Sequence, residues 1–240
     1  MRKGRLLNMA LQGNMIMIDS PDGKFPAYVN KPSDHSNKTP GVIIIHEWWG
    51  LVPHVKGIAD KYAALGYVAI APDLYGGASA SNPDDARKLS MSVTPQNSKK
   101  MIDSTTIYLE ALDLSRIGIT GYCFGGTHAF SYVCESKTIA AGVIYYAGRL
   151  PSDEQLANIS APLLIIYGDQ DHSVTPDQAR QLELTLKTLG KDVQLLLYKG
   201  APHAFANETN KQAYRPEAAN DSWEKTLQFF NSRLKADWQQ

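Results

Sequence analysis

The sequence predicts an α/β fold in which a mostly parallel central β-sheet is flanked by helices on both faces. Two observations favour this class. Short β-branched runs alternate along the chain with segments whose apolar residues recur at helical spacing. The run Val42–Ile45 is apolar throughout, which is typical of a strand buried on both faces of a parallel sheet. A chain of 240 residues, 43% of them hydrophobic, is long enough for a single domain of this kind.

We therefore treat residues 1–240 as one domain with a short polar N-terminal extension, residues 1–13. In the first half of the chain the patterns predict a hairpin, two central strands and three helices. In order, these are Met15–Asp19 paired with Ala27–Asn30, strand Gly41–His46, helix Val55–Ala63, strand Tyr67–Asp73, and helices Asp84–Met91 and Gln96–Leu112. The stretch Gly76–Asn82 is rich in Gly, Ala and Ser, which is typical of a mobile rim around a site.

The second half of the chain continues the alternation. The expected elements are a strand at Ile117–Ile119 leading into a helix at Thr127–Val133, strand Ile139–Tyr146, an amphipathic segment at Gln155–Ile159, strand Pro162–Tyr167, helix Pro176–Leu189, strand Val193–Tyr198 and a closing helix along Trp223–Leu234. The helix at Pro176 has proline in its first turn and Gly190 beyond its end, which are the positions that these residues favour.

Composition excludes several classes of function. The 24 Lys and Arg residues balance the 24 Asp and Glu residues, so neither nucleic acid nor an anionic membrane is indicated as a partner. Two cysteines cannot form a disulfide framework and indicate a reducing compartment. The basic start Met1–Leu7 is not followed by an apolar run of signal-peptide length, and no stretch is long enough to span a membrane. We expect a cytoplasmic protein.

The segment from Arg116 to Phe130 has the strongest chemical signal. A short strand leads into Gly121-Tyr-Cys-Phe-Gly125, and a helical pattern follows. Glycines two residues on either side of a nucleophile are the signature of a nucleophile elbow, a sharp strand-to-helix turn that exposes the nucleophile beside backbone N–H groups. The usual residue there is serine, and here it is Cys123. The alternative is a buried structural cysteine, which is how we interpret Cys134.

Two later strand ends supply an acid and a base. One predicted strand runs into Asp169 and Asp171, and the next runs into His203. The carboxyl ends of parallel strands meet at one edge of a sheet, and the order nucleophile, acid, histidine is that of the α/β-hydrolase fold. We favour Asp171 over Asp169 because the sharper turn at Gly168-Asp169 leaves the later carboxylate free to reach the loop of His203. Either aspartate could instead cap the helix that begins at Pro176.

The other histidines have structural interpretations. We expect His46 to be packed and hydrogen-bonded at a strand end, His128 to lie inside the elbow helix, His172 to be on the surface, and His35 and His54 to be loop or helix-start residues. Neither the histidines nor the two cysteines have the spacing of a metal site, so the sequence predicts no metal and no organic cofactor.

Several short motifs belong together. They are His46-Glu-Trp-Trp-Gly-Leu51, Pro72-Asp-Leu-Tyr-Gly76, Gly121-Tyr-Cys-Phe-Gly-Gly126, Gly168-x-x-Asp171 and Gly200-Ala-x-His203-x-Phe205. As a set they resemble the dienelactone hydrolase (carboxymethylenebutenolidase) family of the α/β-hydrolase superfamily, over a region from Met15 to the closing helix. The resemblance implies an α/β-hydrolase fold and a hydrolase that cleaves small esters or lactones through a covalent acyl-thioester.

The resemblance also implies a role for each matching residue. Cys123 would be the nucleophile, His203 the general base and acid, and Asp171 the partner that orients the histidine. Glu47 matches the family carboxylate that contacts the resting thiol, while from its position alone it could be a solvated carboxylate at a strand end.

The same matching assigns an oxyanion hole, and the aromatic residues nearby predict the rim of a pocket. The backbone N–H groups of Trp48 and Phe124 match the oxyanion hole of the family. We expect Trp48, with Trp49, Tyr75 and Tyr146, to give the pocket rim an apolar and aromatic lining that suits a neutral ligand.

Two positions depart from the family pattern. Dienelactone hydrolases proper place arginines after the Asp-Leu-Tyr motif and four residues after the catalytic histidine, where they bind the substrate carboxylate. The matching positions here are Gly77 and Asn207, and neither Arg149 nor Arg215 occupies a matching position. We therefore expect neutral small esters or lactones to be better substrates than anionic lactones.

Two other functions remain open from the sequence. One is an acyltransferase, in which another nucleophile outcompetes water. The other is a non-catalytic binding protein on the same fold, because a fold does not determine function. The sequence indicates neither the natural substrate nor the oligomeric state.

Overall fold

An eight-stranded sheet runs through residues 13–235, the part of the chain that the computed structural model describes. Its strands are β1 (Asn14–Ser20), β2 (Gly23–Asn30), β3 (Gly41–Ile45), β4 (Val68–Pro72), β5 (Ile117–Tyr122), β6 (Ile139–Tyr145), β7 (Leu163–Gln170) and β8 (Val193–Pro202). They lie in the order β1-β2-β4-β3-β5-β6-β7-β8. The strands β3 to β8 pair in parallel, and β1 and β2 form an antiparallel hairpin attached to β4. The predicted, mostly parallel α/β class is confirmed.

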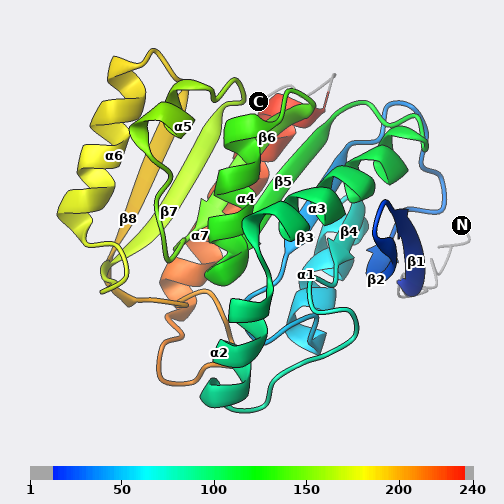
Figure 1. The fold of residues 1–240 in the computed structure, drawn as a ribbon. Helices are drawn as coiled ribbons and strands as arrows, with labels where there is room; N and C mark the ends of the chain where they lie inside the picture. Colours follow the sequence, from blue (N-terminus) through cyan, green and yellow to red (C-terminus); the bar gives the residue numbers. More distant parts are fainter. Residues whose placement is uncertain (1–12, 236–240) are drawn as a thin grey trace, which may run out of the picture.

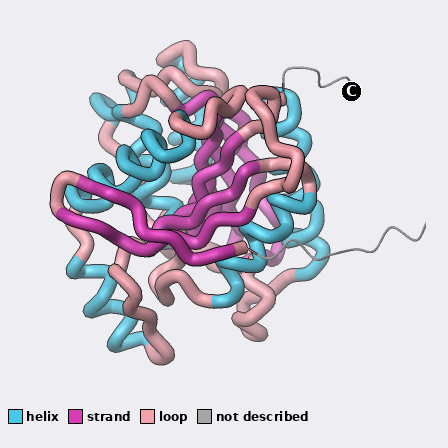
Figure 2. Tube along the Cα trace, turned by 90° about the vertical axis from the view of Figure 1, so that its right-hand side faces the viewer, coloured by secondary structure: helices cyan, strands magenta, loops and turns pink. Residues whose placement is uncertain are grey.

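The helices cover both faces of the sheet. They are α1 (Pro53–Ala64), α2 (Pro83–Ser92), α3 (Pro95–Glu110), α4 (Phe124–Glu135), α5 (Asp153–Ala157), α6 (Pro176–Thr188) and α7 (Pro216–Leu234). Figure 1 shows α1 and α7 behind the sheet and α3, α4 and α6 in front of it. Figure 2, viewed from the β1 edge, shows the strands twisting between these two helical layers.

The core lies along the central strands. Every residue of β3, β4 and β5 is buried, so apolar side chains face helices on both sides of the sheet. This explains the uninterrupted apolar run Val42–Ile45, whose side chains are 0% exposed. Edge strand β1 alternates instead, because only one of its faces is covered, and it leaves Met15 and Met17 exposed.

Local sequence signals account for where the helices begin and end. Helix α6 begins after Thr175, whose side chain accepts from the N–H of Gln178 while the Gln178 side chain accepts from the Thr175 N–H. Pro176 occupies the first turn, and Gly190 beyond the helix end has a φ of +69°. This helix and the opening hairpin were predicted from such turn and cap residues, and both are confirmed.

Three elements, the strands β7 and β8 and the helix α7, run further than the sequence patterns predict. Strands β7 and β8 continue past Tyr167 and Tyr198, so that Gln170 pairs with Pro202 after a register shift. The closing helix α7 begins at Pro216 rather than near Trp223. The extended β7–β8 pairing matters for function, because it brings the loops that follow the two strands side by side.

The structure bears on two other predicted segments, the Gly/Ala/Ser-rich stretch and the N-terminal extension. The Gly/Ala/Ser-rich stretch is joined to the turn after β3 by a bridge between Gly50 and Ser79 and by the Ala80 N–H, which donates to the Trp49 carbonyl at 3.0 Å. The predicted polar extension lies outside the described residues except for Gly13. None of the helices in residues 13–235 has the length and apolar character needed to cross a membrane.

Candidate active site

Cys123 lies in a strained turn between β5 and α4. Its φ of 56° and ψ of −115° are rare for a residue with a side chain. Its N–H donates to the Tyr145 carbonyl at 3.1 Å, and its carbonyl accepts from the Thr127 N–H at 3.0 Å, which fixes the turn on both sides. A Cβ on Gly125 would overlap the backbone oxygen of Ile45. Glycine at this position therefore allows helix α4 to press against the end of β3.

The backbone of this turn adjoins the loop that follows β3. Phe124 is the first residue of α4, and N–H groups at the start of a helix have no acceptor within the helix. The loop after β3 closes on itself, with the Gly50 N–H donating to the Glu47 carbonyl at 3.1 Å. Trp48 lies inside that loop. The two predicted oxyanion donors therefore belong to two pieces of backbone that the contact of α4 with β3 brings together.

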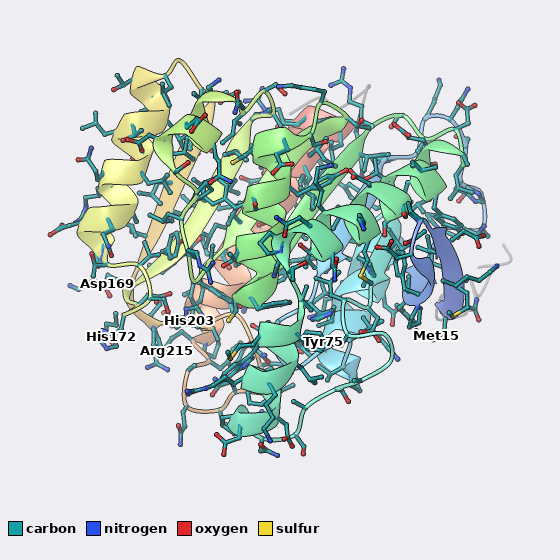
Figure 3. All side chains as sticks on the ribbon, viewed as in Figure 1. Met15, Tyr75, Asp169, His172, His203 and Arg215 are labelled. Carbon is teal, nitrogen blue, oxygen red and sulfur yellow. The ribbon has the colours of Figure 1, made fainter. Side chains whose placement is uncertain are left out.

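The side chains of His203 and Asp171 meet at the ends of β8 and β7. Nδ1 of His203 lies 2.8 Å from Oδ2 of Asp171. The other oxygen, Oδ1, accepts from the Ser173 N–H at 2.8 Å. The Asp171 side chain is 0% exposed and that of His203 is 29% exposed. The carboxylate is therefore held behind the imidazole ring, which is the more exposed of the two groups. Figure 3 shows His203 on the same side of the molecule as Asp169 and His172.

Asp169, the alternative acid, has a different partner. Its Oδ1 accepts a hydrogen bond from the Gly200 N–H at 2.7 Å, which ties the end of β7 to β8. The register of the two strands shifts between Gly168 and Gln170, and such an irregularity re-aims the side chains that follow it. The structure thus gives Asp169 a backbone partner and gives Asp171 the imidazole.

The electrostatic surroundings of His203 favour its charged form. Burial alone would lower the pKa of the ring, but hydrogen bonds to Asp171 and to the Cys123 thiol, with the charges of both groups, raise it to about 10.

The backbone around the ring is strained. Among residues 13–235, non-glycine residues with positive φ are Asp113 and three that lie here, namely Cys123, Tyr146 and Ala204.

Glu47 is buried between these groups, with 3% of its surface exposed. Its Oε2 accepts a hydrogen bond of 2.5 Å from the Asn207 amide, and its Oε1 accepts one of 3.3 Å from the Tyr146 hydroxyl. Burial raises the pKa of its carboxyl, which these hydrogen bonds and the charges of His54 and His203 oppose. Glu47 is therefore not a solvated carboxylate at a strand end, which was the alternative interpretation of its position.

Three of the predicted rim residues form an aromatic border. The rings of Trp48 and Trp49 meet edge to face with their centroids 5.0 Å apart. The Tyr75 hydroxyl donates to the Trp48 carbonyl at 3.1 Å, and the Tyr75 ring centroid lies 5.6 Å from that of Phe124. All three rim side chains are half-buried, as expected for residues at the border of a pocket.

Tyr146, the fourth predicted rim residue, lies beneath the site instead. It is 0% exposed, and its ring packs edge-on against His203 with the centroids 5.2 Å apart. A buried tyrosine hydroxyl needs a hydrogen-bond partner, and here that partner is Glu47. The prediction of a rim position is therefore wrong, because the residue after β6 turns inward at a φ of 34°.

The two positions that depart from the family pattern have structural roles. Gly77 has a φ of +102°, and its N–H donates to Oδ2 of Asp73 at 2.9 Å. A side chain there would strain the turn. Asn207 is 2% exposed and donates to Glu47, while its Oδ1 accepts from the N–H and the hydroxyl of Thr209. The amide of Asn207 is thus oriented from both ends.

The two arginines outside the family positions, Arg215 and Arg149, make other contacts. The guanidinium of Arg215 donates to backbone carbonyls, those of Gly200, Gln212, Ala213 and Tyr214. It fastens the loop that follows His203, and Figure 3 shows both residues on the same side of the molecule. Arg149 is exposed and lies near His128, whose pKa its charge helps to lower.

The remaining histidines and the second cysteine are placed as predicted. His46 is 0% exposed, with Nδ1 2.7 Å from the Glu47 carbonyl and Nε2 accepting from the Leu74 N–H. His128 is buried in α4 beside Ser98, and His172 is exposed. Burial raises the pKa of Cys134 to about 12, which is consistent with a core position. His54 does begin helix α1, but its side chain is buried, which the sequence did not indicate.

These residues together suit acyl transfer to a thiol. A nucleophile in a strained turn, an imidazole beside it, a buried carboxylate behind the imidazole and free N–H groups at a helix start are the parts that such chemistry needs. Among residues 13–235 there is no group of three or more His, Cys, Asp or Glu side chains that could hold a metal ion. Sequence motifs predicted the triad and Glu47, while the contacts of Asn207 and Tyr146 join distant parts of the chain and left no local signal.

Comparison with known proteins gives consistent matches over nearly the whole chain. A model of the dienelactone hydrolase family matches residues 25–234. A protein of Aquifex aeolicus, provisionally named a carboxymethylenebutenolidase, is 33% identical over 237 residues, covering 93% of this chain and 100% of its own. Protein usf of Aquifex pyrophilus is 33% identical over 235 residues, covering 92% and 99%. A crystal structure from Klebsiella pneumoniae, provisionally named a dienelactone hydrolase, has a TM-score of 0.84 at 24% identity, covering 91% of this chain and 98% of its own.

Proposed function

The chain belongs to the dienelactone hydrolase family, and we propose that it hydrolyses small esters or lactones through a Cys123–His203–Asp171 triad and a covalent thioester. Family membership makes it a hydrolase of carboxylic esters. The main support for the triad is the 2.8 Å contact between His203 Nδ1 and Asp171 Oδ2, made next to a cysteine in a strained elbow. With Nδ1 engaged, Nε2 is the ring nitrogen that serves the thiol.

In the first step the Cys123 thiolate attacks the carbonyl carbon of the substrate, and the carbonyl π electrons move to oxygen. The N–H groups of Phe124 and Trp48 stabilise that oxyanion, and one such donor contributes roughly 3–4 kcal/mol. The C–O bond to the leaving group then breaks, and the leaving oxygen takes the proton from Nε2 of His203. A thioester on Cys123 results, and the alcohol of a lactone stays attached to the acyl chain.

In the second step water hydrolyses the thioester. Neutral His203 takes a proton from water at Nε2, and the oxygen attacks the thioester carbon. The tetrahedral intermediate collapses by breaking the C–S bond, which releases the carboxylic acid and returns the thiolate beside the imidazolium. Asp171 holds the ring in the tautomer that both steps use. The family resemblance implies that Glu47 contacts the resting thiol, and the buried position of its carboxylate near His203 is consistent with that role.

A direct test is to trap the acyl-enzyme. Rapid quenching of the pure protein with a small aryl ester, followed by peptide mass spectrometry, should show one acyl group on the peptide that contains Cys123. Cys123→Ala should form no adduct and should lose turnover, whereas Cys134→Ala, a change at a core position, should retain both. Acylation of any other residue, or undiminished hydrolysis by Cys123→Ala, would contradict the proposal.

The alternative functions give different results in the same assay. An acyltransferase would pass the acyl group to an added alcohol or amine in preference to water, so the products are measured with and without such an acceptor. A non-catalytic binding protein would bind the ester without forming an adduct. For this protein we expect the free acid to be the main product both with and without the added alcohol or amine. We also expect turnover to continue in the presence of a metal chelator.

A further inference from the structure

The carbonyl of Glu47 and the N–H of Trp48 belong to one peptide unit. Because that unit is planar and trans, its C=O and its N–H point in opposite directions, and whatever holds the carbonyl also aims the N–H. The Trp48 N–H is a proposed oxyanion donor, and within residues 13–235 it makes no hydrogen bond to a protein acceptor. Such a donor serves a substrate well only if its own peptide unit is held in place.

His46 is the side chain that binds this carbonyl. Its Nδ1 lies 2.7 Å from the Glu47 carbonyl oxygen, and the Gly50 N–H donates to the same oxygen from further along the loop at 3.1 Å. The ring of His46 is 0% exposed, so bulk water does not reach the contact. The Glu47 carbonyl is therefore fixed by two donors, one of which is a side chain.

The second ring nitrogen determines which tautomer His46 adopts. Nε2 lies 3.1 Å from the backbone nitrogen of Leu74, and a backbone N–H can only donate. Nε2 is therefore the nitrogen without a proton, and the proton of the neutral ring is on Nδ1, where it points at the Glu47 carbonyl. Burial lowers the pKa of the ring to about 4, in keeping with a neutral imidazole.

The carboxylate of Asp73 faces Nε2 at 4.0 Å but binds other donors. Its Oδ1 accepts from the Tyr75 N–H at 3.0 Å, and its Oδ2 accepts from the Gly77 N–H at 2.9 Å. These bonds shape the turn after β4 that also contains the Leu74 N–H. His46 thus joins the loop after β3 to the turn after β4, the two segments that carry the aromatic border of the site.

The ring of His46 also packs against the residue that carries the other proposed oxyanion donor. The rings of His46 and Phe124 stack at 21° with their centroids 5.9 Å apart, and Tyr75 meets the His46 ring edge to face at 4.8 Å. A Cβ on Gly125 would overlap the backbone oxygen of His46, so helix α4 lies directly against this residue. One residue therefore contacts both pieces of backbone that carry the two donors.

We propose that His46 is a positioning residue of the oxyanion hole, because its Nδ1–H holds the peptide between Glu47 and Trp48 with the Trp48 N–H turned toward the substrate oxygen. The hydrogen bond also polarises that peptide, which makes its N–H a stronger donor. A histidine that only packed in the core would need neither this tautomer nor this acceptor. The inference rests on the proposed function, since an oxyanion forms only if the thiolate attacks an acyl carbon.

Two substitutions separate the two nitrogens of the ring. In His46→Asn the amide nitrogen takes the place of Nδ1 and still donates to the Glu47 carbonyl. In His46→Gln the amide oxygen takes the place of Nε2 and serves only the Leu74 N–H. Single-turnover acylation of Cys123 by phenyl acetate should slow by about 10–100-fold in His46→Gln, less than the roughly 10²–10³-fold lost with a complete oxyanion donor. His46→Asn should retain most of the rate.

Alkylation of Cys123 by iodoacetamide is the internal reference, because it uses the same thiolate and passes through no oxyanion. Its rate should be the same in the unaltered protein and in both variants. A parallel fall of acylation and alkylation would mean that His46 acts through packing alone and would overturn the proposal. An equal loss of acylation in the Asn and Gln variants would overturn it too.

His128→Gln is the matched control. His128 is also a buried histidine that packs on the Phe124 ring, with the centroids 4.4 Å apart, but its Nδ1 lies 2.7 Å from Oγ of Ser98. Its replacement should leave the ratio of acylation to alkylation unchanged. A fall in that ratio as large as the one in His46→Gln would contradict the role given to the Glu47 carbonyl.

The unaltered protein supplies a test that needs no variant. Nitrogen-15 NMR of histidine-labelled protein, with the His46 ring assigned through its contacts with Phe124 and Tyr75, should show a proton on Nδ1 and none on Nε2 at neutral pH. The opposite tautomer or a charged ring would overturn the proposal even if the variants do not fold. If the unaltered protein forms no acyl-Cys123, the proposed function fails, while the tautomer still decides whether His46 holds the peptide.

Discussion

The two cysteines of the chain differ in the properties that control thiol reactivity. Cys123 is half-buried in the elbow and interacts with His203, whereas Cys134 is 1% exposed and burial raises its pKa to about 12. Because the thiolate is the nucleophile, limited treatment with iodoacetamide should label Cys123 and abolish activity in parallel. Peptide mapping identifies the labelled cysteine, and an ester-hydrolysis assay follows the loss of activity. Labelling of Cys134 while activity stays intact would show that Cys123 is not the reactive thiol.

The charge of His203 gives a prediction about pH. Its raised pKa, about 10, means that the ring is protonated at neutral pH and loses its charge only as pH rises through that value. Proton and nitrogen NMR of the labelled ring should show this high midpoint. Cys123→Ala should lower it, since the thiol and its charge contribute to the shift. A midpoint near the ordinary value in the unaltered protein would contradict the close thiol–imidazole pairing.

The two aspartates after β7 should differ in their effect on rate. His203→Ala removes the proton-transfer group, and we expect a loss in kcat/KM of about 10²–10⁴-fold. Asp171→Asn weakens the control of the ring tautomer. Its loss in kcat/KM should be smaller than that of His203→Ala, because a thiol is more acidic than a serine hydroxyl. Asp169→Asn changes the contact with Gly200 and should give the smallest loss in kcat/KM. A larger loss in Asp169→Asn than in Asp171→Asn would show that the acid is wrongly assigned.

At the scale of secondary-structure elements, the packing of α4 against β3 sets the geometry of the elbow. Adding a methyl group at Gly125 would force the Cβ into the backbone oxygens of Ile45 and His46. We expect Gly125→Ala to lower the free energy of unfolding by about 1–3 kcal/mol, the usual cost of overpacking. Activity per folded molecule should fall as well, because the shift of α4 moves both Cys123 and the Phe124 N–H.

Gly57→Ala is the matched control for that change. Gly57 lies in α1, and a Cβ there would have no atom within 4 Å. Alanine at this position should stabilise the fold by roughly 0.4–1 kcal/mol through the unfolded chain and leave activity unchanged. Chemical denaturation and steady-state kinetics measure both variants. Equal behaviour of Gly125→Ala and Gly57→Ala would show that the close approach of α4 is not needed.

The elements themselves were largely predictable from local patterns. Apolar runs such as Val42–Ile45 identify central strands, and Pro176 with Gly190 marks a helix from start to end. The cap at Thr175 was not predicted. The exact ends of β7 and β8 were not predictable. Their continuation past Tyr167 and Tyr198 depends on pairing between the two strands after a register shift, which is a property of neither strand alone.

At the scale of the whole molecule, the site is assembled where the parallel strands end. The order of Cys123, Asp171 and His203 along the chain was enough to place them at one edge, because the rule of strand ends applies to any parallel sheet. Long-range side-chain contacts could not be predicted from the sequence. Tyr146 turns inward to Glu47, and His54 meets Glu208 across the fold. Burial decides these partnerships, and burial is known only once the elements are packed.

The charge of the preferred substrate is the property that depends on the molecule as a whole. The chain has no net charge to attract anions, Gly77 lies in a turn that disfavours a side chain, and Asn207 is occupied by Glu47. A substrate carboxylate near Glu47 would meet repulsion, and it would be desolvated without the bidentate partner that an arginine offers. The aromatic border of Trp48 and Tyr75 suits neutral groups instead.

We therefore expect a neutral ester to have a higher kcat/KM than an anionic ester with the same leaving group. Phenyl acetate and phenyl hemisuccinate are such a pair, and a carboxylate-bearing dienelactone is the third substrate to compare. Asn207→Arg should raise kcat/KM for the two anionic substrates relative to the neutral one, because its guanidinium adds a positive charge beside Glu47. A preference of the unaltered enzyme for the anionic lactone by tenfold, equivalent to about 1.4 kcal/mol, would mean that another cation, such as Arg149, reaches the bound substrate.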